Sequence, residues 1–419
     1  MSEGGRGSSR ASLEGKTPVE GACADKVRER PRAFENGEEI DMSFLPYGHQ
    51  WIDEEDIAAV VAVLRGDWLS QGPAVEVFEE KVASFLGVRH AVAFSSGTSA
   101  LHGAYWAAGV GPGDVVVTSP LTFAATSNGA LYTGAEVRFA DVDPDTYCLS
   151  PLRAAEAAGP ETKAFAPVSF AGYPADVPAF LALAEKTGAV VIEDACHALG
   201  GDREGRKVGR DALLTALSFH PVKHITTGEG GMVVTESDAY AYRLRRFRSH
   251  GIVKDPKQFL HPAPGPWYTE MQHLGYNYRL SDIQCALGTS QMKRLDDFVA
   301  RRRQLAGWYG ELLKGVERVR PAPVHPGHAW HLYPLWVEPA VRRQVFDGLR
   351  AREIGVQVHY VPVSLHPYYV ERYGLRPGNF PEAEKVSSGE ISLPMFPAME
   401  DGDVDRVVQA LKEILADLS

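Results

Sequence analysis

Short apolar runs alternate with longer stretches of helical spacing along much of the chain. The first five runs are residues 91–94, 115–117, 137–139, 164–168 and 190–192. Two more, residues 214–219 and 231–235, follow with only a short connection between them. Apolar runs of this length are typical of buried parallel strands, and helices between them indicate βα units. The pattern therefore predicts an α/β fold around a mainly parallel central sheet.

Helical spacing and changes in pattern divide the chain into regions. An acidic start at residues 53–56, followed by Ile57, Val60, Val61 and Leu64, predicts a first helix. Further helices are expected over residues 74–86, 281–313 and 403–415, and strands over 332–337 and 357–360. We therefore expect a large domain over residues 44–295 and a smaller C-terminal α+β domain over residues 296–419.

The composition argues against several classes of protein. The formal net charge is -11, whereas nucleic-acid binders usually carry a basic face. The four cysteines show no zinc-like or disulfide spacing, so we expect no metal and a reducing cytoplasm. No apolar run is long enough to span a bilayer, and the N-terminus lacks an apolar signal core. Residues 1–43 are rich in Gly, Ser, Arg, Glu and Pro and are expected to be a disordered tail.

Two of the predicted strands are followed by charged side chains. Asp194 follows the run 190–192, and Lys223 follows the run 214–219. Ligands bind beyond the carboxyl ends of strands in open parallel sheets, so both side chains are expected beside a ligand. Taken singly, Asp194 could equally cap a helix, and Lys223 is more simply a surface charge. A lysine buried in a cleft, however, becomes partly neutral and nucleophilic.

Small polar residues follow the run 91–94. Residues 95–101 read Ser-Ser-Gly-Thr-Ser-Ala-Leu and lead into a helical stretch. Free N–H groups at a helix start bind phosphate, and the hydroxyls of Thr98 and Ser99 would add donors; the alternative is an ordinary N-cap. The motif lacks the lysine of a nucleotide-binding P-loop, so a small phosphate monoester suits it better. Phe123, after another strand, is either a core residue or a plate for a flat ring.

An acid, a lysine, a phosphate-binding turn and an aromatic ring at strand ends fit one cofactor together. Pyridoxal 5'-phosphate needs a carboxylate to keep its ring nitrogen protonated and a lysine to condense with its aldehyde. Its phosphate suits a helix N-terminus, and its ring suits a stacking partner. We therefore predict a pyridoxal-phosphate site at this edge of the sheet.

Four motifs in this order resemble the DegT/DnrJ/EryC1/StrS family of sugar aminotransferases, which has the aspartate aminotransferase-like fold (PLP fold type I). They are residues 95–101, 193–197, 218–223 and 275–281, and the resemblance covers about residues 44–417. Within the family the chain is similar to the branch that acts on UDP-4-keto-6-deoxy-N-acetyl sugars in pseudaminic acid biosynthesis. That likeness rests on residues 67–73, 218–231, 359–363 and 367–369.

The resemblance implies a role for individual residues. Lys223 would form the Schiff base, Asp194 would pair with the pyridinium nitrogen, and His197 would lie against O3′ of the cofactor. The phosphate would be held by Gly97, Thr98, Ser99 and Ser218, and Phe123 would stack on the ring.

The resemblance also implies a homodimer with shared active sites. Asn277 and Arg279 would reach the phosphate of the neighbouring subunit's cofactor. His224 departs from the Pro or Asn that close relatives carry directly after the lysine.

The predicted reaction is transfer of an amino group from L-glutamate to C4 of a nucleotide-linked 4-keto-6-deoxy sugar. Lys223 would move the proton between cofactor and substrate carbon. There are three alternatives: an aminotransferase for another nucleotide ketosugar of antibiotic or lipopolysaccharide biosynthesis, a sugar 3-dehydratase, and a non-catalytic regulatory protein. Dehydratases of the family carry histidine in place of the lysine, and a regulatory protein is expected to have lost the lysine or the aspartate. Lys223 and Asp194 therefore favour the aminotransferase.

Overall fold

A computed structural model describes residues 33–35, 38–40 and 44–418. The chain divides into two compact units, Met1–Phe44 and Leu45–Ser419. Within the first unit the structure describes the short antiparallel strands β1 (Ala33–Glu35) and β2 (Glu38–Ile40). The rest of the predicted disordered tail lies outside the described residues.

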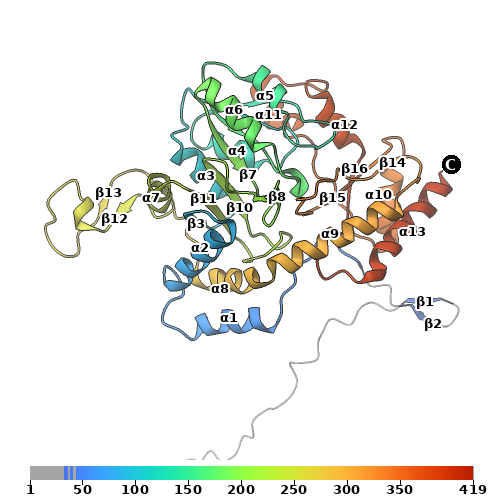
Figure 1. Cartoon of the computed structure of the whole chain (residues 1–419), viewed down its shortest axis with the longest axis horizontal. Helices are drawn as coiled ribbons and strands as arrows, with labels where there is room; N and C mark the ends of the chain where they lie inside the picture. Colours follow the sequence, from blue (N-terminus) through green and yellow to red (C-terminus); the bar gives the residue numbers. More distant parts are fainter. Residues whose placement is uncertain (1–32, 36–37, 41–43, 419) are drawn as a thin grey trace, which may run out of the picture. The chain divides into compact units, whose positions relative to one another are not determined.

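A seven-stranded sheet forms the centre of the second unit (Figure 1). Its order is β3 (His90–Phe94), β11 (Gly231–Thr235), β10 (Leu214–Ser218), β7 (Val190–Asp194), β6 (Thr162–Ala166), β4 (Val115–Thr118) and β5 (Glu136–Phe139). β11 is antiparallel to both neighbours, and all other pairs are parallel. The predicted α/β fold with a mainly parallel sheet is confirmed.

Helices cover both faces of this sheet. Alternate residues of β3 point to opposite sides: Val92 and Phe94 belong to one core cluster, and Ala91 and Ala93 to another. The first cluster also contains residues of α3 (Gly97–Ala107), α4 (Ala125–Leu131) and α7 (Asp238–Phe247). The opposite face packs on α2 (Pro73–Leu86), α8 (Asp282–Gln291), α5 (Pro151–Ala157) and α6 (Val177–Thr187). Between these two layers of helices, the carboxyl ends of the parallel strands form the site.

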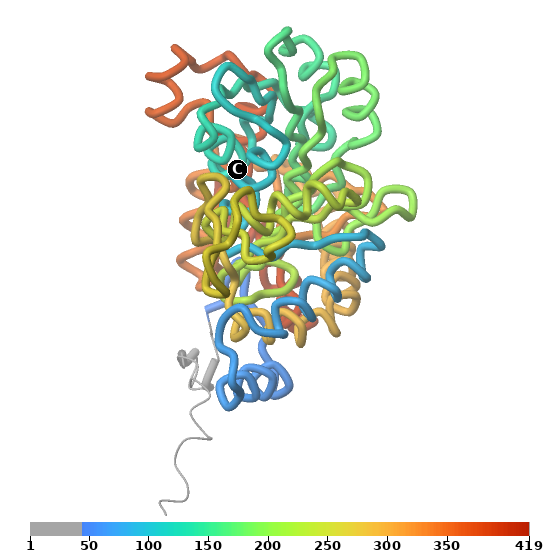
Figure 2. The backbone as a smooth tube through the Cα atoms, turned by 90° about the vertical axis from the view of Figure 1, so that its left-hand side faces the viewer, coloured from blue at the N-terminus to red at the C-terminus, as the bar shows by residue number. Residues whose placement is uncertain are grey.

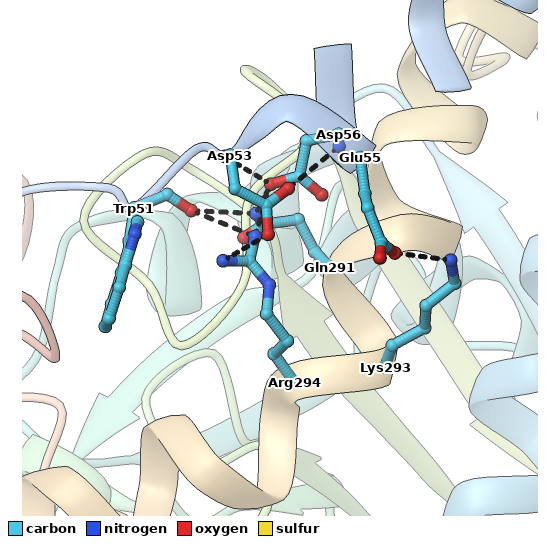
Figure 3. A network of polar contacts seen from close by, with 7 residues as sticks. All are labelled: Trp51, Asp53, Glu55, Asp56, Gln291, Lys293 and Arg294. Carbon is cyan, nitrogen blue, oxygen red and sulfur yellow. Dashed lines mark hydrogen bonds and ion pairs between the residues drawn. The ribbon is translucent and has the colours of Figure 1, made fainter. Parts of the chain in front are cut away.

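The helix α1 (Glu54–Leu64) packs on α8 and lies at one end of this unit (Figure 2). An ion-pair network holds it there: Arg294 contacts both Asp53, at 2.9 Å, and the buried Asp56, and Lys293 pairs with Glu55 at 2.9 Å (Figure 3). Gln291 donates to Asp56 Oδ2 and to the carbonyl oxygen of Trp51. We call these seven residues the α1 network.

The C-terminal part contributes a second small sheet. Strands β14 (Val319–Arg320), β15 (Tyr333–Val337) and β16 (Glu390–Leu393) share a core with α9 (Leu295–Leu312), α10 (Arg342–Ala351) and α13 (Asp401–Asp417). Val363 and Tyr369, from the η4–α11 region (Val363–Leu365 and Pro367–Tyr373), instead belong to the core of the large sheet. The predicted boundary near residue 295 between a large and a small domain stays a prediction. Val363 and Tyr369 come after this boundary in the sequence but pack with residues that precede it.

The predicted single helix over residues 281–313 is wrong. A 3-10 turn, Met292–Arg294, separates α8 from α9. Arg294 has non-helical dihedral angles, and its side chain extends to Asp53 and Asp56. The break therefore places Arg294 where it can pair with α1.

The predicted strand over residues 357–360 is also wrong. Only Gln357 makes an isolated bridge, to Ser392, and the N–H of His359 is donated to the Glu390 side chain rather than to a strand.

An arm carrying β12 (Ile252–Val253) and β13 (Glu270–Met271) extends from the α7 end of the unit (Figure 1). Among the described residues, no helix is both long and apolar enough to cross a membrane.

Candidate active site

A cavity of about 430 Å³ lies at the carboxyl ends of the parallel strands. Most of the site residues expected from the sequence line it together: Gly97, Thr98, Phe123, Asp194, His197, Ser218 and Lys223. They come from the last residues of β7 and β10 and from the segments that follow β3, β4, β7 and β10. Because the carboxyl ends of parallel strands meet at one edge of a sheet, residues far apart in sequence converge here.

Asp194, the last residue of β7, is held by two hydrogen bonds. Its Oδ2 accepts from the Thr126 hydroxyl at 2.6 Å, and its Oδ1 accepts from the Cys196 N–H at 3.1 Å. The side chain is only 5% exposed but still lines the cavity. Asp194 is therefore a carboxylate held in one orientation, not a helix cap.

Lys223 lies in the turn after β10, and its Nζ is 3.3 Å from His331 Nε2. Burial lowers the pKa of Lys223 to about 8, although Cys196 and Asp194 act in the opposite direction. A lysine with this pKa is partly neutral at physiological pH. Its amine is thus a nucleophile and a base, and Lys223 is not a plain surface charge, because it is half-buried and lines the cavity.

The turn after β3 forms the start of α3. Ser96 and Ser99 cap the helix reciprocally, and this cap does not use the N–H groups of Gly97 and Thr98. A Cβ on Gly97 would lie 3.0 Å from Ser218 Cβ and 3.2 Å from Cys196 Sγ. Glycine therefore keeps the space beside Ser218 open, and the helix N-terminus offers two N–H donors to an anion.

His197 and Tyr360 form another wall of the cavity. Tyr360 OH is 3.2 Å from His197 Nε2, and burial holds the pKa of His197 well below its ordinary value. His197 Nδ1 is buried and has no hydrogen-bond partner among the described residues. Phe123 is 58% exposed, and its ring centroid is 6.0 Å from that of Tyr360. Phe123 is thus available to a ligand rather than part of the core.

Three residues expected at the site do not line the cavity. The Ser99 hydroxyl contacts Ser96 within the cap. Asn277 is exposed and forms a β-bridge with Ser249, and Arg279 is half-buried.

His224, the residue that departs from the family pattern, is buried with Nε2 3.0 Å from the carbonyl oxygen of Ala329, so its ring points into the protein.

The model of the DegT/DnrJ/EryC1/StrS aminotransferase family matches residues 50–412. The chain belongs to this family. The predicted family is confirmed, and with it the aspartate aminotransferase-like fold.

Similar DegT/DnrJ/EryC1/StrS proteins cover nearly the same length. The spore coat polysaccharide biosynthesis protein SpsC of Bacillus subtilis (strain 168) is 40% identical over 379 residues, 89% of this chain and 97% of that protein. Helicobacter pylori PseC, an aminotransferase involved in the biosynthesis of pseudoaminic acid, is 30% identical with a TM-score of 0.84, covering 90% of this chain and 100% of PseC. A putative sugar aminotransferase of Streptococcus pneumoniae, Spr1654, solved in its PMP form, is 27% identical with the same TM-score and the same coverage.

The cofactor of this DegT/DnrJ/EryC1/StrS aminotransferase is pyridoxal 5'-phosphate, as predicted; structures of Spr1654 exist in PLP and PMP forms. The cavity fits such a group. His197 with its unpartnered Nδ1, Gly97 with the space that a Cβ would fill and Asp194 with its fixed carboxylate all line one cavity. These features supply a ring contact, a phosphate site and a partner for a cationic ring nitrogen.

The sequence did not single out several residues of this site. Thr126 and Tyr360 occur within motifs quoted for other residues, and His331 precedes a predicted strand. Their contacts to Asp194, His197 and Lys223 join positions 68, 163 and 108 residues apart. A hydroxyl in the first turn of α4 or an imidazole before a strand carries no local signal of such a partner.

Proposed function

We propose that the protein transfers the amino group of L-glutamate to C4 of a nucleotide-linked 4-keto-6-deoxy sugar, with a UDP-4-keto-6-deoxy-N-acetylhexosamine as the first substrate to test. The observation that carries the proposal is the meeting of Lys223, Asp194 and the Gly97–Thr98 turn around one cavity. The sugar assignment is supported by the names of similar proteins, PseC and SpsC.

Bound pyridoxal phosphate would supply an electron sink for the carbon that loses its proton. Asp194, held by Thr126, keeps the ring nitrogen protonated. Gly97, Thr98 and Ser218 would hold the phosphate, Phe123 would cover the ring, and His197 would lie against its O3′.

Lys223 has two tasks in this proposal. As a neutral amine it is the group that attaches the cofactor, and once released it takes a proton from the substrate carbon and returns one to the neighbouring position. Its pKa of about 8 makes it able both to accept and to give a proton near neutral pH. Burial is the main cause of the lowered pKa of Lys223, and it also keeps water away from the proton that Lys223 transfers.

We further propose that the active protein is a cytoplasmic homodimer. Asn277 is exposed rather than directed into its own cavity, and it would instead reach, with Arg279, the phosphate in the partner's site. Cross-complementation tests this: mixing Lys223→Ala and Asn277→Ala subunits should restore about a quarter of the native activity if sites are shared. No recovery in proven heterodimers would contradict it.

The half-reaction with the amino donor tests the reaction class. Adding L-glutamate to the holoenzyme should lower the visible absorbance of the lysine-linked cofactor, raise that of the pyridoxamine form and release 2-oxoglutarate. D-Glutamate is the matched control. No spectral change with any amino acid would overturn the proposal.

A panel of nucleotide 4-ketosugars, each with L-glutamate, then tests the acceptor by the mass of the product. UDP-linked N-acetylated sugars are expected to react fastest. A faster reaction of a sugar without the N-acetyl group, or with another nucleotide, would favour the alternative acceptor of antibiotic or lipopolysaccharide biosynthesis.

A further inference from the structure

A fully buried carboxyl group, that of Glu390 on β16, lies behind the cavity wall. It is 0% exposed, and no salt bridge to it is found among the described residues. Burial raises the pKa of Glu390 to about 8. Nothing in the proposed reaction uses this group, although a buried acid without a cation is costly to keep.

Glu390 is joined to the cavity by a short chain of hydrogen bonds. Its Oε1 is 2.5 Å from Ser392 Oγ, and Ser392 Oγ is 2.9 Å from His359 Nδ1. Its Oε2 accepts from the backbone N–H of His359 at 2.6 Å. His359 itself lines the cavity beside Lys223 and Tyr360. One oxygen of the acid therefore contacts the cavity residue His359 directly, and the other reaches it through Ser392.

The other ring nitrogen of His359 is free for a ligand. Within the described part of the chain, Nε2 has no hydrogen-bond partner and is not among the fully buried unpartnered atoms, and His359 lines the cavity. Burial holds the pKa of His359 at about 3, so the ring is neutral and carries one proton. Which nitrogen carries that proton decides whether His359 offers the cavity a donor or an acceptor.

The hydrogen-bond chain couples that choice to Glu390. When Glu390 is an acid, its O–H donates to Ser392, Ser392 donates to His359 Nδ1, and the histidine proton is on Nε2. When Glu390 is a carboxylate, Ser392 donates to Glu390 and accepts from His359 Nδ1–H, which leaves a lone pair on Nε2. In both states Oε2 can accept from the His359 N–H, so the backbone is unchanged.

We propose that Glu390 is a positioning residue that, through Ser392, keeps the proton of His359 on Nε2, so that His359 donates a hydrogen bond to an oxyanion of the substrate. The oxyanion is a carboxylate of the amino donor or a phosphate of the nucleotide sugar. This second half of the inference rests on the proposed function; the proton position does not.

The direction with pH follows from the groups around the pair. Glu390 and His359 are faced by Arg342, Tyr147, Tyr360, Tyr47, His197 and Lys223. Arg342 lowers the pKa of Glu390, but burial outweighs it. Glu390 is thus mainly an acid below about pH 8, and the Nε2–H donor is lost as the pH rises through that value.

The proton position is tested by NMR on the full-length holoenzyme with 15N-labelled histidine. At pH 7 the His359 signal, assigned by its loss in His359→Gln, should be that of the neutral Nε2–H form, and at pH 9 that of the Nδ1–H form. In Glu390→Gln the amide donates to Ser392 as the acid does, so the Nε2–H form should persist at pH 9. A native protein with the Nδ1–H form at pH 7, or with one form at both pH values, would overturn the proposal.

Binding is tested by KM between pH 7 and 9, separately for L-glutamate and for the nucleotide sugar. Loss of one charge-assisted hydrogen bond should raise the KM of one substrate about tenfold in the native enzyme and leave it nearly constant in Glu390→Gln. The substrate whose KM changes identifies the oxyanion. The titration of Lys223 is common to both proteins and cancels in the comparison.

Two variants separate positioning from a structural role. Ser392→Ala breaks the chain and should raise the same KM at pH 7, with kcat changed less. Glu193→Gln is the matched control, because Glu193 is a second buried acid, with a pKa raised by burial to about 7, bonded to Ser169 and Thr215 instead of a cavity residue. It should leave the pH dependence of KM as in the native enzyme. The proposal that His359 binds a substrate oxyanion would be overturned if Glu193→Gln changed the pH dependence of KM as much as Glu390→Gln does, or if Glu390→Gln changed neither KM. An enzyme that is inactive with every amino donor would instead overturn the proposed function and leave the NMR result standing.

Discussion

The α1 network and the cavity both join charged side chains from distant parts of the chain, but they pair them differently. In the α1 network Arg294 contacts two carboxylates, and Lys293 contacts a third. In the cavity the hydrogen-bond partner of Lys223 is a neutral imidazole, and Nδ1 atoms of both His197 and His331 have no partner within the described residues. Charges that are neutralised hold elements together in the α1 network, whereas the cavity side chains keep polar atoms without a partner among the described residues.

The same difference explains why the pKa of Lys223 and the pKa of Asp53 are both lowered, with opposite effects on charge. Around Lys223 the opposing effects of Cys196 and Asp194 do not offset burial, so its pKa falls. The pKa of Asp53 is lowered by hydrogen bonding to the Asp56 N–H and by Arg294, which keeps it ionised for the ion pair. Ion pairing thus keeps Asp53 charged in the α1 network, whereas Lys223 in the cavity is partly neutral.

The largest expected effect comes from removing the unpaired amine. Lys223→Ala should lower turnover by about a thousandfold or more, because the base and the attachment point are lost together. Its thermal midpoint should not fall, since a buried amine is removed rather than an ion pair. Product formation by mass and melting curves check this, with the exposed Lys186→Ala as control; residual turnover near the native rate would take Lys223 out of its role.

Breaking the α1 network should affect stability and not chemistry. Arg294→Met leaves Asp56 buried without its cation and should cost about 3 kcal/mol of unfolding free energy. Lys293→Met removes an exposed pair and should cost less than about 1 kcal/mol. Urea unfolding measures both, and activity per folded molecule should be unchanged; equal costs for the two variants would contradict the distinction drawn here.

The smallest effect is expected where a hydroxyl holds Asp194. Thr126→Val keeps the shape but removes the donor to Oδ2, and should lower kcat by about fivefold to tenfold. Thr126→Ser keeps the hydroxyl and should retain most of the activity. If both variants behave alike, Thr126 acts through packing rather than through its hydrogen bond.

The sequence predicted what local patterns encode. Asp194, Lys223 and the Gly97–Thr98 turn each follow an apolar run, and strand ends are where a parallel sheet binds ligands. The link from Glu390 to His359 was not predicted, because it depends on two segments whose pairing has no local signal. The break at Met292–Arg294 was missed because it contains neither glycine nor proline, so helical spacing continues through it.

β11, the one antiparallel strand of the seven-stranded sheet, has a consequence for how the protein is made on the ribosome. β11 lies between β3, which carries the Gly97–Thr98 turn, and β10, which precedes Lys223. A nascent chain that has not yet extended through Thr235 lacks the strand that holds these two halves of the site side by side. Cofactor capture therefore belongs to a late stage of synthesis, after more than half of the chain has been translated.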